Sequence, residues 1–264
     1  MSNPRIYGKA PYAIAVVHGG PGAAGEIAPV ARVLAAAGRG VLEPLQTAAT
    51  LDGQVDELHD LLTANAALPA VLVGWSWGAW LAWLAAARYP AVVRKLILVA
   101  SGPFEERYAG AVRAARLRRL TAAERTELEA VEAALGAGPA AEDDRRLARL
   151  GELCGQADAY DPLPDDDESL EVRWDIAAGV WPAAAEMRRR GALLELAPRI
   201  RCPVVALHGD ADPHPYRGVR DPLKQALADF RFILLEKCGH TPWRERRARA
   251  RFFEILEREL TGAL

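Results

Sequence analysis

The sequence predicts an α/β protein in which a mostly parallel central sheet is flanked by helices and carries a helical insertion. Short, continuous apolar runs alternate with segments of helical apolar spacing, a pattern typical of parallel strands that are covered on both faces. The alternation stops after residue 101 and returns near residue 187. We therefore expect a core domain of residues 1–101 and 187–264, with residues 102–186 forming a helical cap. Such a cap would cover the carboxyl edge of the sheet, where ligands bind in open α/β folds.

The first part of the core is expected to alternate strand and helix from the start. The predicted strands are 13–17, 40–43, 70–73 and 95–100. Helical spacing of apolar residues predicts helices over 26–37, 52–62 and 78–89. Gly38 is placed to end the first helix as its C-cap.

The insertion and the second part of the core follow in the same way. The expected cap helices are 108–120, 122–135, a third near 142–153, and two pieces around 170–179 and 182–190. An acidic run at residues 165–168 is expected to be a solvated loop. The core then resumes with strands 203–207 and 230–235, a helix over 221–229 with Pro222 in its first turn, and a C-terminal helix over about 243–260.

Composition excludes several classes of partner. The formal net charge is −2, so neither a nucleic acid nor an acidic surface is an expected partner. No apolar stretch reaches the roughly 18 residues that a membrane span needs, and no secretory leader pattern is present, so we expect a cytoplasmic protein with no membrane partner. The three cysteines are widely spaced and are expected to be free thiols. The sequence is compatible with a monomer or a homodimer.

The motif Gly74-Trp75-Ser76-Trp77-Gly78 is the strongest signal for chemistry. It has the G-x-S-x-G pattern of a nucleophile elbow, between a predicted buried strand and a predicted helix. A sharp strand-to-helix turn exposes the serine hydroxyl at the sheet edge, and small residues on either side prevent collisions there. We therefore expect Ser76 to be a catalytic nucleophile.

A nucleophilic serine needs a base within hydrogen-bond reach and an acid that orients the base. In the hydrolase arrangement these follow along the chain in the order Ser, Asp, His, each after a strand. Ser76, Asp212 and His240 occur in that order, and each follows a predicted strand. Asp210 on the same loop is the alternative acid, and we expect it to form a turn instead. His214 is the alternative base, but its place on the loop of the acid makes a bond to Asp212 unexpected.

The remaining site residues are expected around the glycine-rich loop His18-Gly19-Gly20-Pro21-Gly22. The backbone N–H groups of Gly20 and Trp77 would form the oxyanion hole, which stabilises the tetrahedral intermediate. His18 would shape this loop, and with Trp75 beside the nucleophile it is a candidate for the lining of the substrate pocket. The chemistry needs no metal and no organic cofactor.

Taken together, the motifs resemble those of α/β-hydrolase fold enzymes over nearly the whole chain. The HGGPG and GxSWG elements are similar to those of the proline iminopeptidase (S33 peptidase) branch, whose triad and oxyanion positions match the residues named above. Trp174-Asp175 resembles the aromatic-acidic cap element of that branch, with Asp in place of Glu, and adds Trp174 to the candidate pocket. The segment Glu43-Pro44-Leu45-Gln46 replaces the Asp-Gln-Arg-Gly element of that branch.

The expected activity is therefore that of a serine hydrolase that cleaves an ester or amide bond of a small molecule or short peptide through an acyl-enzyme intermediate. A carboxylesterase and an iminopeptidase-like aminopeptidase are both compatible with the motifs. Two other functions stay open at this point. One is a ligand-binding protein of this fold with slow or absent turnover, and the other is a cofactor-free perhydrolase that uses the same triad.

Overall fold

The computed structural model describes residues 3–164 and 170–262. Within these ranges the main sheet has seven strands, and the edge strand β1 runs antiparallel to β4 while the other neighbours pair in parallel. From one edge to the other the strands are β1 (Arg5–Tyr7), β4 (Gly40–Glu43), β2 (Tyr12–Val17), β5 (Ala70–Trp75), β6 (Val93–Val99), β8 (Val204–Gly209) and β9 (Phe230–Leu235). The predicted mostly parallel sheet is thus confirmed.

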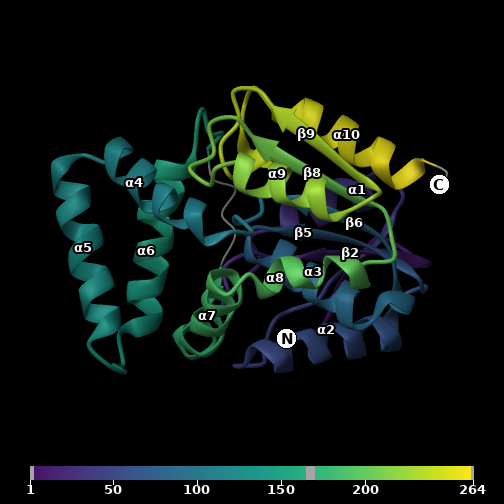
Figure 1. Cartoon of the computed structure of the whole chain (residues 1–264), viewed down its shortest axis with the longest axis horizontal. Helices are drawn as coiled ribbons and strands as arrows, with labels where there is room; N and C mark the ends of the chain where they lie inside the picture. The colour runs from purple at the N-terminus through teal and green to yellow at the C-terminus, as the bar shows by residue number, and fades with distance from the viewer. Residues whose placement is uncertain (1–2, 165–169, 263–264) are drawn as a thin grey trace.

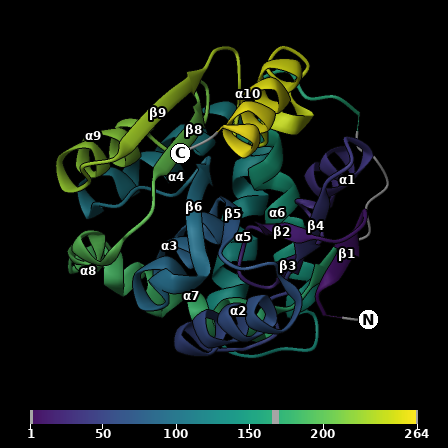
Figure 2. The same cartoon turned by 90° about the vertical axis from the view of Figure 1, so that its right-hand side faces the viewer.

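Helices cover both faces of this sheet (Figures 1 and 2). The strand β5 shows how the sequence achieves this, because Leu72 packs into the core on one face while Val71 and Val73 pack into the core on the other. On the Val71 side lie α1 (Ala28–Ala36) and α10 (Arg249–Thr261). On the Leu72 side lie α2 (Leu51–Asn65), α3 (Trp77–Arg88) and α9 (Arg217–Ala226). Both faces are therefore dry, as a parallel sheet requires.

The segment between β6 and β8 is largely helical; its helices α4 to α6 project from the core at the left of Figure 1, while α7 and α8 pack against the core. It contains α4 (Ala109–Arg119), α5 (Ala122–Gly136), α6 (Asp143–Asp158), α7 (Trp174–Arg189) and α8 (Ala192–Glu195). A capping box begins α5, since Thr121 and Glu124 each bind the other's backbone N–H. The insertion is also tied to the core by a two-stranded antiparallel sheet of β3 (Ala23–Ala24) and β7 (Glu171–Val172).

Three predicted helix boundaries differ from the structure. The two pieces expected around 170–190 form one helix, α7, which continues through Pro182 because Val180 and Ala184 on either side of it are buried. The helix α9 begins at Arg217, so Pro222 lies inside it instead of in its first turn. The C-terminal helix begins at Arg249, after a separate loop. The acidic run at residues 165–168 lies outside the described residues.

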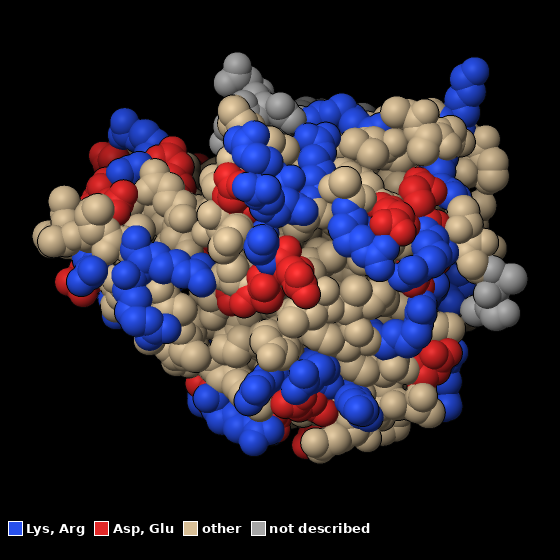
Figure 3. Space-filling model, turned by 90° about the horizontal axis from the view of Figure 1, so that it is seen from above, with Lys and Arg blue, Asp and Glu red and all other residues tan. Residues whose placement is uncertain are grey.

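Four 3-10 turns connect the larger elements of the described chain: η1 (Pro90–Val92), η2 (Glu106–Tyr108), η3 (Ala197–Arg199) and η4 (Pro242–Arg244). Figure 3 shows basic and acidic side chains interspersed over one face of the molecule. Near the C-terminus Arg246 contacts Asp161, and Arg251 pairs with Glu254, as expected for a solvated face with mixed charges. None of the described helices combines the length and the apolar character that crossing a membrane would need.

Candidate active site

Ser76 lies at the junction of β5 and α3, in a backbone conformation that is strained for a residue with a side chain. Its φ and ψ are 54° and −118°, and its N–H bonds to Val99 O at 3.0 Å. The turn is tight because a Cβ on Gly78 would lie 2.2 Å from the carbonyl oxygen of Val17. Only glycine fits there, so the chain can pass close to β2 and present the Ser76 hydroxyl at the carboxyl edge of the sheet.

The two other predicted triad residues reach Ser76 from loops after neighbouring strands. His240 Nε2 lies 3.0 Å from Ser76 Oγ, and His240 Nδ1 lies 2.8 Å from Asp212 Oδ2. Asp212 follows β8, and His240 follows β9. Because a carboxylate only accepts hydrogen bonds, Nδ1 carries the proton and Nε2 is free to accept the Ser76 hydroxyl proton. The three side chains thus form one continuous hydrogen-bonded chain.

Asp212 is surrounded by histidines. In addition to His240, it accepts hydrogen bonds at Oδ1 from the backbone N–H of His214 at 2.8 Å and from His214 Nδ1 at 2.9 Å. His208 Nε2 lies 3.3 Å from the other oxygen. The expectation that His214 would not contact Asp212 is therefore wrong. An Asx turn folds the chain back two residues after the acid, and this turn brings the ring of His214 onto it.

These contacts set the charges of the site. Burial opposes ionisation of Asp212, but the charges of His240, His214 and His208 outweigh it and hold the pKa of Asp212 well below its usual value. Burial also opposes protonation of His240, yet Asp212 raises the pKa of His240 above 6.5. For His214, burial and the charge of His240 lower the pKa to about 4. Near neutral pH, His214 is therefore neutral and Asp212 is ionised.

The loop that carries His240 is fixed by three separate contacts. The indole Nε1 of Trp75 donates to the carbonyl oxygen of His240 at 2.8 Å. The backbone N–H of His240 donates to the carbonyl oxygen of Asp158 at 2.9 Å. Next to it, the N–H of Gly239 donates to the carboxylate of Glu245 at 3.0 Å. Trp75 is 6% exposed, so it supports His240 from within the core and contributes almost nothing to an open pocket wall.

The same buried carboxylate explains why the C-terminal helix begins late. Glu245 accepts hydrogen bonds from the backbone N–H groups of Tyr160 and Asp161, both at 2.8 Å, as well as from Gly239. Ion–dipole bonds of this kind satisfy the charge of a side chain that is 1% exposed. The chain around Glu245 is therefore held in a loop, and the helix follows it.

The glycine-rich loop after β2 lies beside the nucleophile, since a Cβ on Gly19 would come within 3.3 Å of Ser76 Cβ. Gly20 has a φ of +28°, which glycine adopts most easily. Trp77 is the first residue of α3, so its N–H has no acceptor within the helix. The two backbone N–H groups predicted as oxyanion donors thus belong to a strained loop and a helix N-terminus, respectively.

His18 is fully buried and supports this loop instead of facing a pocket. Its Nδ1 donates to Gly19 O at 2.9 Å, and its Nε2 accepts the backbone N–H of Gln46 at 3.2 Å. Burial lowers the pKa of His18 to about 4, so the ring is neutral. The side chain of Gln46 donates to His18 O at 2.8 Å and accepts from the indole Nε1 of Trp77 at 2.8 Å. Gln46 therefore links the two predicted oxyanion segments.

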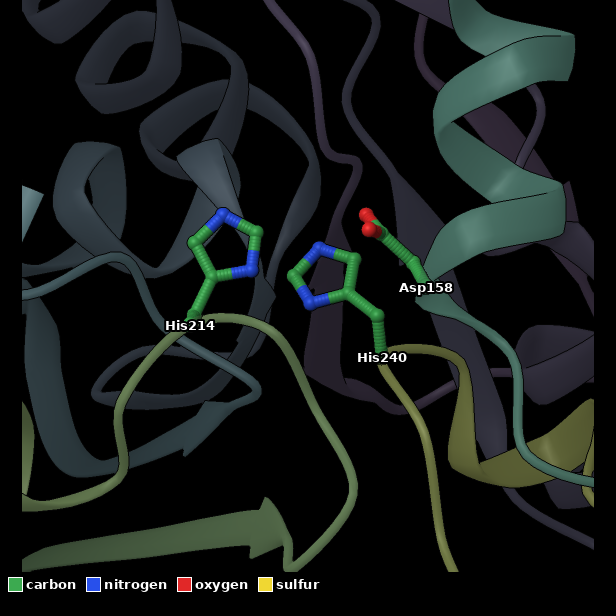
Figure 4. A group of neighbouring side chains, drawn as sticks. All are labelled: Asp158, His214 and His240. Carbon is green, nitrogen blue, oxygen red and sulfur yellow. The ribbon is translucent and has the colours of Figure 1, made fainter. Parts of the chain in front are cut away.

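In Figure 4, His240 lies between His214 and Asp158, which is the last residue of α6 in the insertion. Arg116 of α4 binds both of its carboxylate oxygens, at 2.7 and 2.6 Å. The ring of His214 stacks on that of His240 with centroids 4.3 Å apart. One ligand atom each from Asp158, His214 and His240 lie within 4.8 Å of one another. Because the guanidinium of Arg116 already neutralises the carboxylate, this cluster is better suited to a neutral polar guest than to a metal cation.

Two further predicted residues lie apart from these contacts. Trp174 begins α7, and its N–H donates to Asp144 in α6 at 2.7 Å. The pocket-lining role predicted for Trp174 therefore stays a prediction. Asp210, the alternative acid, accepts the N–H of Cys238 at 3.2 Å and so joins the loops after β8 and β9.

Comparison with known proteins places this arrangement in a family. Residues 14–254 match the family described as "Alpha/beta hydrolase family". The chain belongs to the α/β hydrolase family. This α/β hydrolase is 31% identical over 199 residues to a pimeloyl-[acyl-carrier protein] methyl ester esterase of Chromobacterium violaceum, a match that covers 71% of the chain and 69% of the relative.

Solved structures of similar fold cover nearly the whole of this α/β hydrolase. The crystal structure of VinJ has a TM-score of 0.70 and 22% identity, and the match covers 97% of this chain and 93% of VinJ. A carboxylesterase structure from the Thaumarchaeon Nitrososphaera gargenis has a TM-score of 0.64 and 17% identity, with 97% and 93% covered. At these identities the two likenesses bear on the fold alone. The resemblance to α/β-hydrolase fold enzymes is confirmed at the level of the family.

Sequence reasoning missed several residues of this site: Gln46, Arg116, Asp158, Glu245 and Gln54, which accepts a second bond from Trp77 Nε1 at 3.3 Å. A signal existed for Gln46, because it is a polar residue that follows a buried strand at the carboxyl edge of the sheet. Arg116 and Asp158 are 42 residues apart and meet only when the cap helices fold together. No local pattern marks such a pair.

Proposed function

We propose that this α/β hydrolase cleaves the ester bond of a small substrate through an acyl-enzyme intermediate. Ser76 Oγ attacks the ester carbonyl carbon while His240 Nε2 takes the hydroxyl proton, and Asp212 stabilises the imidazolium that forms. The N–H groups of Gly20 and Trp77 bind the oxyanion of the tetrahedral intermediate. The bond from carbon to the leaving oxygen then breaks, and His240 passes its proton to the departing alcohol. In the second half of the reaction, water attacks the acyl-enzyme by the same steps and releases the acid.

The continuous hydrogen-bonded chain from Ser76 through His240 to Asp212 carries this proposal. Its two links of 3.0 and 2.8 Å have the lengths that proton transfer needs in a resting enzyme. The strained backbone of Ser76 supports it as well, because strain of this kind persists where a function requires the conformation. The similarity to a methyl ester esterase points to esters as the substrate class.

Ester cleavage is favoured over aminopeptidase activity by the state of the cap. Asp175 is the acidic residue that resembles the iminopeptidase element, and its carboxylate accepts hydrogen bonds from Arg173 at 2.8 and 2.6 Å. Both side chains are about half exposed. A carboxylate that is neutralised by a neighbouring arginine at the surface has little electrostatic attraction left for the free amine of a peptide.

The test combines an active-site label with a substrate screen. We expect a fluorophosphonate probe to label the wild-type protein and not the Ser76→Ala variant. We also expect p-nitrophenyl esters of short acyl chains to be hydrolysed by the wild type alone, and prolyl and alanyl anilides to be cleaved much more slowly. A protein that binds ligands without turnover would fail to react with the probe. Unchanged ester turnover in Ser76→Ala would refute the assigned nucleophile.

A further inference from the structure

Two more polar groups lie next to His240: the carboxylate of Asp158 and the ring of His214. The carboxylate of Asp158 comes from the last residue of cap helix α6 and is 5% exposed. Arg116 holds it in a bidentate contact, and the backbone carbonyl of Asp158 accepts the N–H of His240. Each carboxylate oxygen keeps a lone pair after this contact. Asp158 is therefore a fixed hydrogen-bond acceptor beside the catalytic histidine.

His214 supplies another acceptor. Its Nδ1 must donate to Asp212, because the carboxylate can only accept, and its ring is neutral near pH 7. The remaining nitrogen, Nε2, therefore carries a lone pair. Stacking on His240 fixes the plane of the ring, with 24° between the two planes. In Figure 4 the nitrogens of both rings that Asp212 does not bind lie on the same side as the Asp158 carboxylate.

The spacing of these groups defines a seat for one small polar molecule. One ligand atom each of Asp158, His214 and His240 lies within 4.8 Å of the others, and the rings of His214 and His240 stack with their centroids 4.3 Å apart, so one small polar molecule can reach both rings. Any molecule that gives a proton to His240 must lie within hydrogen-bond reach of its Nε2. We propose that His214 holds the water molecule that hydrolyses the acyl-enzyme in contact with His240, beside the carboxylate of Asp158.

The step balances as follows, and it rests on the proposed function. One O–H of the water donates to His240 Nε2, and the other donates to His214 Nε2. As His240 takes the first proton, the water oxygen forms a bond to the acyl carbon and the carbonyl oxygen becomes the oxyanion. The bond from carbon to Ser76 Oγ then breaks, His240 returns its proton to Oγ, and the acid leaves.

This seat distinguishes water from alcohols. Water can donate to His240 and to a second acceptor at once, whereas an alcohol has a single O–H and leaves the second acceptor without a partner. An unsatisfied acceptor in a buried site is unfavourable. The proposal therefore predicts that the enzyme hydrolyses its acyl intermediate in preference to transferring the acyl group to an alcohol, and that this preference depends on His214.

The experiment measures how the acyl-enzyme divides between water and methanol. The wild type and variants are supplied with p-nitrophenyl acetate in buffer with methanol, and acetic acid and methyl acetate are quantified by chromatography. The ratio of the two products does not depend on the rate of acylation or on the fraction of active enzyme. In His214→Asn the side-chain amide replaces the Nδ1–H donor to Asp212 and leaves nothing at the place of Nε2. We expect its ratio of hydrolysis to methanolysis to fall about fivefold, as for the loss of one hydrogen bond.

Arg119→Ala is the matched control. Arg119 is exposed and donates to the carbonyl oxygens of Ala157 and Ala211, so it joins the end of α6, next to Asp158, to the loop that carries Asp212 and His214. We expect this variant to keep the wild-type product ratio even where its rate falls. If His214→Asn folds poorly, His214→Phe replaces it in the experiment. It keeps a ring stacked on His240, and we expect the same fall in the ratio of hydrolysis to methanolysis.

Two results would overturn the seat. One is an unchanged product ratio in the folded His214 variants, and the other is an equal fall in Arg119→Ala, which would trace the effect to loosened loops. Failure of the proposed function gives a different result, because a wild type that forms neither product and takes no fluorophosphonate label has no acyl-enzyme to divide.

Discussion

Replacing Gln46 by leucine tests whether the two predicted oxyanion segments depend on one side chain. Gln46 donates to His18 O and accepts from Trp77 Nε1, both at 2.8 Å, while the indole has a weaker second contact to Gln54 at 3.3 Å. Leucine keeps the volume but leaves the His18 carbonyl without this donor. One such buried group costs about 1–3 kcal/mol, so we expect the free energy of unfolding to fall by about 2 kcal/mol.

The effect of this substitution on activity should appear in kcat. Loss of a whole oxyanion donor costs about 3 kcal/mol, or roughly a hundredfold in rate, and a displaced donor should cost less. We therefore expect kcat of Gln46→Leu on p-nitrophenyl acetate to fall about tenfold with little change in KM, because the oxyanion contact strengthens only in the transition state. Urea unfolding and steady-state kinetics measure the two quantities.

Gln54→Leu is the control for the same network. Gln54 contacts Trp77 and, at 3.0 Å, the carbonyl oxygen of Ala48, but has no contact with His18. It should lose stability while kcat stays within about twofold of the wild type. The reasoning fails if Gln46→Leu loses stability and keeps its kcat, or if both variants lose kcat equally, since either result would make the network purely structural.

Three further predictions follow from the site. Burial opposes protonation of His240, but Asp212 raises the pKa of His240 above 6.5. In a pH–rate profile kcat/KM should therefore fall as the pH drops through a value above 6.5, where His240 becomes protonated. Asp212→Asn should move this acidic limb of the profile to lower pH. Burial lowers the pKa of His18 to about 4, so the unfolded state binds the extra proton between pH 6.5 and 4. The wild type should therefore lose about 2 kcal/mol of stability between pH 7 and 5 that a His18→Gln variant keeps, as measured by urea unfolding at each pH. Gly78→Ala places a Cβ 2.2 Å from Val17 O. The free energy of unfolding of this variant should therefore fall by about 3 kcal/mol or more. An unchanged melting temperature would contradict the tight turn around Ser76.

Much of the fold could be predicted because its signals are local. The continuous apolar run before Ser76 and the glycines around it determine a buried strand, a tight turn and a helix without help from distant residues. The predictions were wrong where tertiary contacts override a local rule. Proline normally ends a helix, but α7 passes through Pro182 because burial of apolar residues on both sides of it outweighs one missing hydrogen bond.

The candidate site likewise has some residues that local signals predict and others that only tertiary contacts bring together. The order of Ser76, Asp212 and His240 after successive strands could be read from the chain, since parallel strands bring their carboxyl ends to one edge. The contact between His214 and Asp212 depends on an Asx turn. Such a turn is made by a bond from a side chain to the backbone, and no pattern of apolar residues in the sequence reveals it. The supports of His240 come from residues 75, 158 and 245, so they could be known only after the core, the cap and the C-terminal loop were placed together.

These supports make the insertion a part of the site's framework. Helix α4 of the insertion contributes two arginines to these contacts. Arg119 binds the carbonyl of Ala211, next to the predicted acid Asp212. Arg116 binds the carboxylate of Asp158, whose own carbonyl accepts the N–H of His240. The β3–β7 pairing joins the same insertion to the chain just beyond the oxyanion loop. An insertion that moved as a rigid lid would have to break hydrogen bonds to the loops of Asp212 and His240 and to the chain just after the oxyanion loop at once. Substrate entry by movement of a smaller segment is therefore less costly than opening of the whole insertion.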